Sequence, residues 1–417
     1  MIIVFVMDSY GIFSNGTTAT AQRFATYLRR RGHTVRILAA SSSSSPKAKD
    51  YYAVAPFKIP IFQPLIDKQG FTFAKADKKV IYEAIKGADL VHLFLPFHLE
   101  SVARQMAHKL NIPVTSAFHL QPENVTYTIY LGKNRLINYE FYRYLYKHFY
   151  KYVKHVHCPS KMIANQLQNH GYNTNTFHVI SNGVVPEFHR IDSDKPRDLQ
   201  DKYVVLMIGR LSREKRQDLI IKAIGNSKYN AKIQLILCGQ GPNRHKLEKL
   251  AKARLANPII FKFVSQEELV KIINYSDLYV HASDAEIEAI ACIEAFTCGL
   301  VPVISDSPIS ATNQFALSER NLFQNGNYKS LQKQIEYWIE NPQEKTKLSE
   351  KYIEYAKQYA IENEVDKLEK VFEKAVAENR LNESLPSITL SRRELRKEKK
   401  ISNEVDQIIL ENTNEIN

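Results

Sequence analysis

The sequence predicts an α/β protein with two doubly wound, Rossmann-like domains, each built around a parallel sheet. The chain has 417 residues, of which 44% are hydrophobic, and this length exceeds the size at which one core usually stops growing. Short apolar runs alternate with longer amphipathic stretches, which is the rhythm of repeated βαβ units. A polar stretch with two prolines interrupts that rhythm between Val184 and Lys202 and marks the expected linker.

The expected domains and strands follow the chain in order. The first domain spans residues 1–186, with strands in IIVFVM, TVRILAA, DLVHLFLP, IPVTSAFHL, HVHCPS and FHVISNG. Residues 187–202 form the linker, and the second domain, residues 203–360, has strands in YVVLMIGR, IQLILCG, IIFKFV, DLYVHAS and LVPVIS. Residues 361–383 are expected to form a helix that returns to the first domain. The last segment, residues 384–417, contains SRRELRKEKK and is expected to be a charged helical tail.

Charge and cysteine content narrow the function classes. Lys and Arg outnumber Asp and Glu by 57 to 44, a net charge of +13, which favours nucleotide phosphates, nucleic acid or an acidic membrane surface as partners. The four cysteines form no CxxC pair and no His run has metal spacing, so neither a disulfide framework nor a zinc site is expected. We expect a cytoplasmic protein, because Met1 leads into a strand rather than a signal peptide, and no window approaches the roughly twenty apolar residues of a membrane span.

Residues that follow the apolar runs are the first site candidates, because ligands of doubly wound sheets bind beyond the carboxyl ends of the strands. Asn15 and Gly16 open a helix whose free amides could hold an anion or admit a substrate; the alternative is an ordinary strand-to-helix turn. His119 follows a strand directly, although a lone histidine there is more often structural. Arg210 and Lys215 follow the first strand of the second domain, where they could neutralise a diphosphate or form a solvated basic turn.

Two acids lie eight residues apart in SDAEIEAIACIEAFTCGLVPVIS. Eight residues of continuous helix turn through about 800°, so Glu286 and Glu294 would not share one tight face. They would converge if Glu286 lay in a loop and Glu294 in a helix that begins near Ala289. The helix amides would then take phosphates and the carboxylates would accept hydroxyl hydrogen bonds, which suits a phosphorylated, polyhydroxylated ligand. A glycosidase-type acid pair is disfavoured, because no second donor acid lies nearby.

Together these motifs resemble the retaining GT-B glycosyltransferases of family 4 (glycosyl transferases group 1) over nearly all of the first 380 residues. The E-x7-E element runs from Glu286 to Glu294, and IGRLSREK, CGQGP and VISNGVV match the family's Gly-Arg-Leu, Gly-x-Gly-Pro and Asn-Gly-Val segments. RRRGHTV matches a Gly-His-x-Val segment and places Asn15 and Gly16 on the family's paired glycines. Asparagine is the substitute that best tolerates left-handed backbone. The resemblance implies a GT-B fold whose two domains face a cleft.

The resemblance also implies roles for individual residues. The implied donor-binding residues are Gly16, Arg210, Lys215, Glu286, Ile290 and Glu294. Arg210 and Lys215 would bind the diphosphate of a UDP-hexose, and Glu294 would bond the ribose. Glu286 would touch the transferred sugar and His119 would lie by the anomeric centre, which makes these two the catalytic positions; Gly16 would let donor and acceptor meet. No cofactor and no metal are implied, because cations and a helix dipole would stabilise the leaving group.

One further departure from the family concerns the loop after Glu286. The family often has small glycines there, whereas this chain has Ile287, Glu288 and Ala289. The backbone amides remain available in such a loop, but Ile287 is expected to narrow the pocket. The resemblance therefore leaves the donor sugar open.

The acceptor is expected to be a membrane lipid such as diacylglycerol, as in similar bacterial diacylglycerol glucosyltransferases, or a cell-envelope glycan. On a helix through residues 130–155, Arg143, Lys147, Lys151 and Lys154 would share one face. Such a face could lie on anionic lipid at the inner face of the cell membrane, at about 1 kcal/mol per cation. The alternative is a helix with a buried apolar side and solvated cations. No nucleic-acid-binding signature accompanies these residues.

Two other function classes stay open. A non-catalytic GT-B subunit could bind sugar or stabilise a partner transferase, but the set of Gly16, His119, Arg210, Lys215 and Glu294 argues against it. A sugar-nucleotide epimerase would need acid and base groups that the sequence does not assign.

Overall fold

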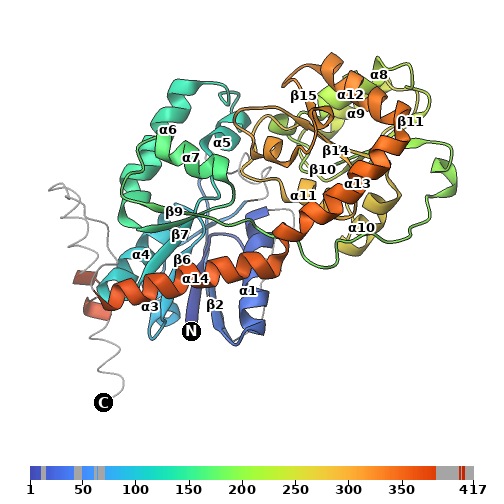
Figure 1. Cartoon of the computed structure of the whole chain (residues 1–417). Helices are drawn as coiled ribbons and strands as arrows, with labels where there is room; N and C mark the ends of the chain where they lie inside the picture. The colour runs from blue at the N-terminus through green and yellow to red at the C-terminus, as the bar shows by residue number, and fades with distance from the viewer. Residues whose placement is uncertain are drawn as a thin grey trace. The chain divides into compact units, whose positions relative to one another are not determined.

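The computed structural model describes residues 1–10, 16–41, 49–60, 63, 71–381, 403–404 and 406–408. These residues form two compact units (Figure 1). Unit 1 consists of Met1–Leu120, Arg135–Ile180 and Glu364–Asn417, and unit 2 of Gln121–Asn134 and Ser181–Asn363. Each unit is built around its own parallel sheet with helices packed on it, as the alternating apolar runs predict.

Unit 1 has a seven-stranded parallel sheet in the order β3-β2-β1-β6-β7-β8-β9. Its strands are β1 Ile2–Val6, β2 Thr34–Ala40, β3 Tyr51–Val54, β6 Leu90–Leu93, β7 Val114–Ala117, β8 His155–Cys158 and β9 Thr176–Val179. The strand order reverses between β1 and β6, where Phe5 pairs with His92. This reversal is the topological switch point of the sheet, the usual place of a ligand. A separate antiparallel pair joins β4 Pro56–Phe57 to β5 Phe73–Ala74.

The helices of unit 1 cover a sheet whose central strands are buried on both faces. They are α1 Gly16–Arg30, α3 Lys78–Ile85, α4 His98–Lys109, α6 Arg135–His148, α7 Lys161–Asn169 and the 3₁₀ turn η1 Tyr150–Tyr152. β6, β7 and β8 are buried throughout, as expected for central strands of a parallel sheet with helices on both faces.

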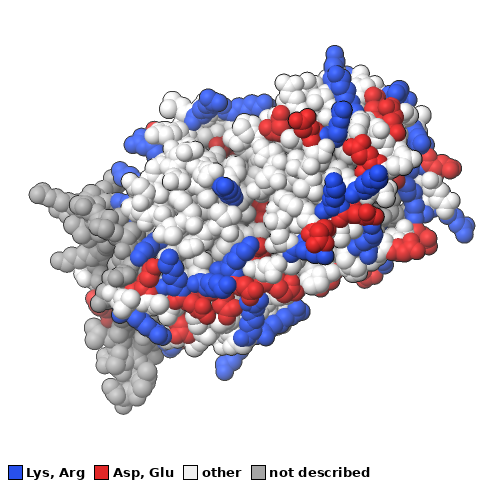
Figure 2. Space-filling view, in the orientation of Figure 1, with Lys and Arg blue, Asp and Glu red and all other residues white. Residues whose placement is uncertain are grey.

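The helix α14, Ile361–Arg380, packs on unit 1 through a buried apolar side, and charged side chains beside it add ion pairs. Glu369 on this helix accepts from Arg31 at 2.9 Å and contacts the Nε2 atom of His33 at 2.6 Å. Near its end, Glu378 contacts the Nε2 atom of His155 at 2.8 Å. Figure 2 shows acidic and basic side chains side by side along this helix. The stretch 391–400 of the expected tail lies outside the described residues.

Unit 2 has a six-stranded parallel sheet in the order β12-β11-β10-β13-β14-β15, with its switch point between β10 and β13. Its strands are β10 Tyr203–Ile208, β11 Ile233–Cys238, β12 Ile260–Lys262, β13 Leu278–His281, β14 Pro302–Ser305 and β15 Leu322–Phe323. Its helices are α5 Pro122–Thr128, α8 Gln217–Gly225, α9 Arg244–Lys252, α10 Gln266–Tyr275, α11 Ile290–Thr297, α12 Tyr328–Glu340 and α13 Pro342–Ala356. Short 3₁₀ turns are η2 Arg197–Leu199, η3 Arg213–Lys215, η4 Ala311–Phe315, η5 Glu319–Asn321 and η6 Lys357–Tyr359.

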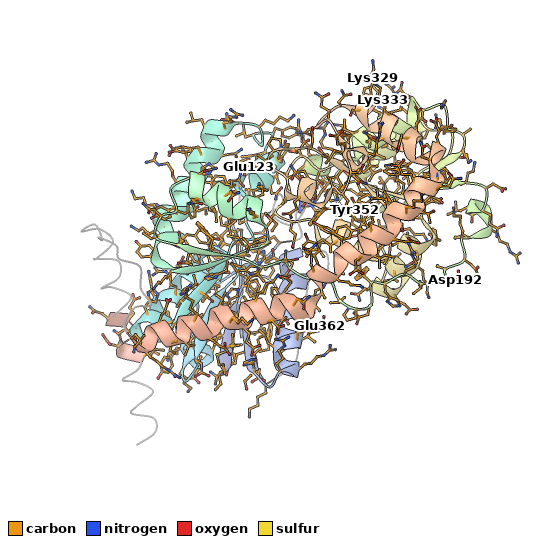
Figure 3. The ribbon with its side chains drawn as sticks, in the orientation of Figure 1. Glu123, Asp192, Lys329, Lys333, Tyr352 and Glu362 are labelled. Atoms are coloured by element: carbon orange, nitrogen blue, oxygen red, sulfur yellow. The ribbon has the colours of Figure 1, made fainter. Side chains whose placement is uncertain are left out.

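The core of unit 2 includes buried aromatic residues with satisfied polar ends. Tyr352 of α13 is fully buried, and its hydroxyl donates to the carbonyl of Phe315 at 2.9 Å and accepts from the amide of Leu317 at 3.2 Å (Figure 3). These bonds fix α13 against the segment after β14, because a buried hydroxyl without partners would be costly.

All eleven runs expected to be strands contain one. The strands β3, β4, β5 and β15 were not expected. β4, β5 and β15 have two residues each, too few for an apolar pattern, and β3 has only one buried residue among its four. The four cysteines are free and buried. None of the helices in the described ranges has the length and apolar character needed to cross a bilayer.

Candidate functional site

The candidate site lies in unit 2, at the switch point between β10 and β13. The segments after these two strands, residues 209–216 and 282–289, leave neighbouring strands at the same edge of the sheet. Because the carboxyl ends of parallel strands at a switch point form a ligand crevice, polar residues gathered there are candidates for binding.

The Gly-x-Gly-Pro turn allows the exits of β10 and β11 to approach closely. A Cβ atom on Gly239, whose φ is +151°, would lie 2.1 Å from the carbonyl oxygen of Gly209, and one on Gly241 would lie 2.4 Å from that of Leu211. The amide of Leu211 donates to the carbonyl of Gln240 at 2.8 Å. Only glycine fits at such contacts. The turn therefore shapes the segment that carries Arg210 and Lys215, which is a structural role.

Four side chains form a polar chain at this site, in which Lys215 is half-buried and the other three are buried. The ammonium group of Lys215, at the end of η3, donates to Oε1 of Glu286 in the loop after β13. The same oxygen lies 3.0 Å from Nε2 of His281, and Nδ1 of His281 lies 3.0 Å from the hydroxyl of Tyr279. With a proton on Nε2, the histidine donates to the carboxylate and accepts from the tyrosine, so both of its ring nitrogens are satisfied.

The charge of Glu286 is set by these partners. Burial disfavours its ionised form, but the Lys215 ammonium and the hydrogen bond from His281 outweigh burial and hold the pKa of Glu286 below its usual range. The carboxylate is therefore ionised at neutral pH and can accept hydrogen bonds from hydroxyl groups.

Arg210 follows the same strand as Lys215 and is half-buried. Burial lowers the pKa of its guanidinium, and the nearby carboxylate of Glu214 acts in the opposite direction. Its carbonyl accepts from the side chain of Gln217 at 2.8 Å, which ties the segment to α8. A partly desolvated guanidinium is well suited to a bidentate phosphate contact.

The helix α11 presents its N-terminus beside Glu286. It begins at Ile290, as the spacing of the two acids predicts, with Glu286 in the loop and Glu294 inside the helix. Ala289 caps the helix with φ +71° and ψ +70°, the left-handed region that residues with a Cβ seldom occupy. Such strain often accompanies function. Ile290 is half-buried and Glu294 is buried.

A second buried ion pair holds the loop between β13 and α11. Asp284 accepts from Arg216 at 3.0 Å and from the hydroxyl of Tyr127 on α5 at 3.0 Å. Arg216 also has a left-handed φ of +53° and bonds Asp218 at 3.1 Å. Burial and the Asp284 carboxylate raise the pKa of Tyr127, so its hydroxyl stays protonated. These contacts fix the loop from two sides.

Sequence reasoning missed His281, Asp284, Arg216 and Tyr127. His281 is the last residue of β13, so the rule that placed the other candidates at strand exits could have found it. Asp284 and Arg216 stand one or two residues from predicted site residues, yet their pairing depends on the turn geometry of both loops. Tyr127 lies 157 residues from Asp284 in the chain, and no local pattern reports such a contact.

The remaining predicted site residues, His119 and Gly16, belong to unit 1. His119 follows β7 and is buried against the ring of Phe94, with ring centroids 5.8 Å apart. Its Nε2 atom has no hydrogen-bond partner among the described residues. Burial, together with nearby His157, holds the pKa of His119 well below its usual value, so the ring is neutral at pH 7. Gly16 is exposed at the start of α1 with open space around it, and Asn15 lies outside the described residues.

The four cations expected on one helix do not share one. α6 ends at His148, so Arg143 and Lys147 lie on it, whereas Lys151 lies in η1. Lys154 precedes β8 and forms an ion pair with Glu378 at 2.9 Å. The chain must turn at this point to enter β8, and for that reason the helical period cannot continue to Lys154.

Comparisons with known proteins agree with this architecture. A family profile for glycosyltransferase family 4 matches residues 14–188, and one for glycosyl transferases group 1 matches residues 189–359. Alpha-monoglucosyldiacylglycerol synthase from Streptococcus pneumoniae is 24% identical over 311 residues, which cover 72% of this chain and 69% of the relative.

Solved structures support the fold. Sucrose-phosphate synthase from Thermosynechococcus elongatus has a TM-score of 0.73 at 15% identity and covers 90% of this chain and 99% of its own. HepE from Anabaena, in complex with UDP-glucose, has a TM-score of 0.69 at 17% identity and covers 90% of this chain and 100% of its own. The fold is GT-B. The chain belongs to the group 1, family 4 glycosyltransferases, enzymes that transfer a sugar from a nucleotide-sugar donor.

Proposed function

We propose that the protein is a retaining transferase that moves a hexose from a UDP-hexose to a membrane lipid such as diacylglycerol, or to a cell-envelope glycan. The observation that carries the donor half of this proposal is the chain of polar side chains from the half-buried Lys215 through Glu286 to His281. It pairs an anion-binding cation with an ionised carboxylate at the N-terminus of a helix, which suits a diphosphate joined to a sugar. The UDP-glucose complex of a protein with this fold supports the choice of base.

In the proposed reaction, Lys215 and Arg210 bind the diphosphate and Glu294 bonds the ribose. Glu286 accepts hydrogen bonds from hydroxyls of the sugar. The bond between the anomeric carbon and the phosphate oxygen breaks, and its electron pair stays with the diphosphate, whose growing charge the two cations and the α11 amides stabilise. The acceptor hydroxyl then bonds the anomeric carbon from the same face and gives its proton to the leaving phosphate oxygen. His119 and Gly16 are predicted to act beside the anomeric carbon.

The experiment is calorimetry of the purified protein with UDP-glucose, UDP-galactose, UDP-GlcNAc and GDP-mannose. We expect one UDP-sugar to bind, and Glu294→Ala to weaken it by about 10- to 100-fold through the lost ribose hydrogen bonds. Glu350→Gln, on the exposed side of α13, is the control and should bind as wild type does. If none of the four donors binds, the result contradicts the proposal and favours a non-catalytic role.

The acceptor half of the proposal is supported by one face of α6. Leu136 is 70% exposed and Tyr139 is 46% exposed, and these residues share a helical face with Arg143 and Lys147. Figure 2 shows basic side chains over this part of the molecule. Apolar and basic side chains on one exposed face suit the surface of an anionic bilayer. The lipid named in the synthase relative is consistent with such an acceptor.

Vesicle sedimentation tests this half. We expect vesicles with phosphatidylglycerol to retain the protein at low salt, and the double change Arg143→Gln with Lys147→Gln to weaken retention by roughly 30-fold, at about 1 kcal/mol per cation. The control is Lys329→Gln with Lys333→Gln, two exposed lysines on α12 (Figure 3). Equal retention of both double variants would leave a glycan as the proposed acceptor.

A further inference from the structure

Glu288 is a buried acid that no part of the proposed mechanism uses. It stands between Glu286 and the strained Ala289, and only 1% of its surface is exposed. Its Oε2 atom accepts two hydrogen bonds from Asn182, one from the backbone amide at 2.9 Å and one from the side-chain amide at 2.6 Å. A buried carboxylate is stable only with such partners. Glu288 therefore joins the loop after β13 to the Asn-Gly-Val segment, 106 residues away.

The segment that holds Glu288 is itself fixed. Gly183 has φ +74°, and a Cβ atom there would lie 2.9 Å from the Cα atom of Ile361. The amide of Val184 donates to the carbonyl of Tyr359 at 2.8 Å, and the amide of Ile361 donates to the carbonyl of Val184 at 3.0 Å. Residues 182–184 thus form a rigid pair with residues 359–361, and a group bonded to Asn182 is bonded to a fixed point of unit 2.

The loop that contains Glu288 needs such a support. We name residues 286–290 the donor loop. It carries the sugar-binding carboxylate of Glu286 at one end and the first amide of α11 at the other, with Ala289 in a left-handed conformation between them. A residue with a Cβ in that region returns to ordinary backbone angles unless its neighbours prevent it. Ile287, Ala289 and Ile290 are half-buried, so Glu288 is the buried residue between Glu286 and α11.

We propose that Glu288 is a positioning residue whose bonds to Asn182 hold the donor loop in its binding conformation. Without them the loop would relax at Ala289, and Glu286 and the α11 amides would no longer point at one ligand. Binding groups held by such second contacts lose affinity when the contacts are removed. The proposal rests on the donor site proposed above, because it assumes that residues 286–290 contact a nucleotide sugar.

Calorimetry with UDP and with UDP-glucose tests the proposal in four variants. We expect Glu288→Ala to weaken the binding of UDP-glucose by about 10- to 100-fold, the effect of a lost bond to a charged group. Glu288→Gln keeps an acceptor oxygen and should lose less than Glu288→Ala. Asn182→Asp places two carboxylates in contact and should lose at least as much affinity for UDP-glucose as Glu288→Ala does. The double variant Asn182→Asp with Glu288→Gln restores an amide facing a carboxylate and should recover part of the affinity.

The outcomes separate this proposal from the one it rests on. If the wild-type protein binds no nucleotide sugar, the donor site itself is wrong. If it binds and Glu288→Ala binds within twofold of it, Glu288 does not position the loop. If Glu288→Ala does not fold, the pair Asn182→Asp and its double variant decides: recovery in the double variant supports the contact, and no recovery rejects it. Glu350→Gln serves again as the exposed control.

Discussion

Both sheets carry buried acids at their switch points, and the two sites differ in what surrounds those acids. In unit 1, Asp8 follows β1 and interacts with Glu100 on α4, and each is at most 1% exposed. Burial raises the pKa of Asp8 to about 6, and burial together with Asp8 raises that of Glu100 well above its usual value. In unit 2, Glu286 is also buried, but Lys215 and His281 lower its pKa.

The comparison shows that position in the fold does not decide what an acid can do. Asp8 accepts from the amide of Ala74 at 2.7 Å through Oδ1 and so fixes the segment of β5. Glu286 keeps a negative charge because a cation and a histidine stabilise it. An ionised carboxylate can accept hydrogen bonds from sugar hydroxyls, whereas a carboxyl group whose pKa is raised by burial resists ionisation. Under the proposed function, the neighbouring cation is what lets Glu286 act as a binding acid rather than a structural one.

Removal of the Lys215 ammonium group should have the largest effect of the changes predicted here, and the effect is on catalysis. Lys215→Ala takes away the proposed phosphate ligand and leaves Glu286 buried without its counter-charge. We expect kcat/KM for the UDP-hexose to fall by about 10³-fold, as when a main electrostatic group is lost from an active site. Lys333→Ala, on the exposed side of α12 (Figure 3), should leave kcat/KM unchanged. A loss of less than tenfold in Lys215→Ala would mean that unit 2 binds its donor without this pair.

The buried acids of unit 1 should change how the free energy of unfolding depends on pH. A carboxyl whose pKa is raised on folding contributes stability below its unfolded value of 3.8 and loses it as pH rises through about 6. Asp8→Asn keeps the acceptor for Ala74 but cannot ionise. Relative to wild type, it should gain on the order of 2–3 kcal/mol of unfolding free energy between pH 4 and pH 8, at 1.36 kcal/mol per pKa unit.

Urea unfolding at several pH values between 4 and 8 measures this difference. Asp192→Asn, at an exposed position of the linker (Figure 3), should follow wild type at every pH. A difference between Asp8→Asn and wild type that stays constant with pH would mean that Asp8 is ionised in the folded protein. Asp8 of unit 1 and Glu286 of unit 2 would then both be ionised in the folded protein.

The sequence predicts the sheets and the places of several candidate-site residues in the fold, because both depend on local pattern. Apolar runs mark the strands, and strand exits mark Arg210, Lys215 and Glu286. The eight-residue spacing of the acids places Glu294 on a helix that begins where α11 begins. Contacts between distant parts of the chain cannot be predicted in this way. The hydrogen bonds between Asn182 and Glu288, for example, depend on how two loops meet in the folded protein. The end of α6 at His148 was missed for a similar reason, since β8 sets it.

Substitution of Ala289 has the smallest expected effect, a change in the free energy of unfolding. It tests the backbone strain that distinguishes the donor loop. At φ +71° and ψ +70°, glycine is less strained than alanine, although it also adds freedom to the unfolded chain. Ala289→Gly should therefore raise the free energy of unfolding by up to about 1 kcal/mol. Ala291→Gly, two residues further on in α11, should lower it by about 1 kcal/mol, because its backbone is helical. The opposite signs, measured by urea unfolding, are the result to look for. If both changes destabilise equally, the left-handed turn is absent in solution, and the donor loop would hold Glu286 without the strain that Glu288 is proposed to support.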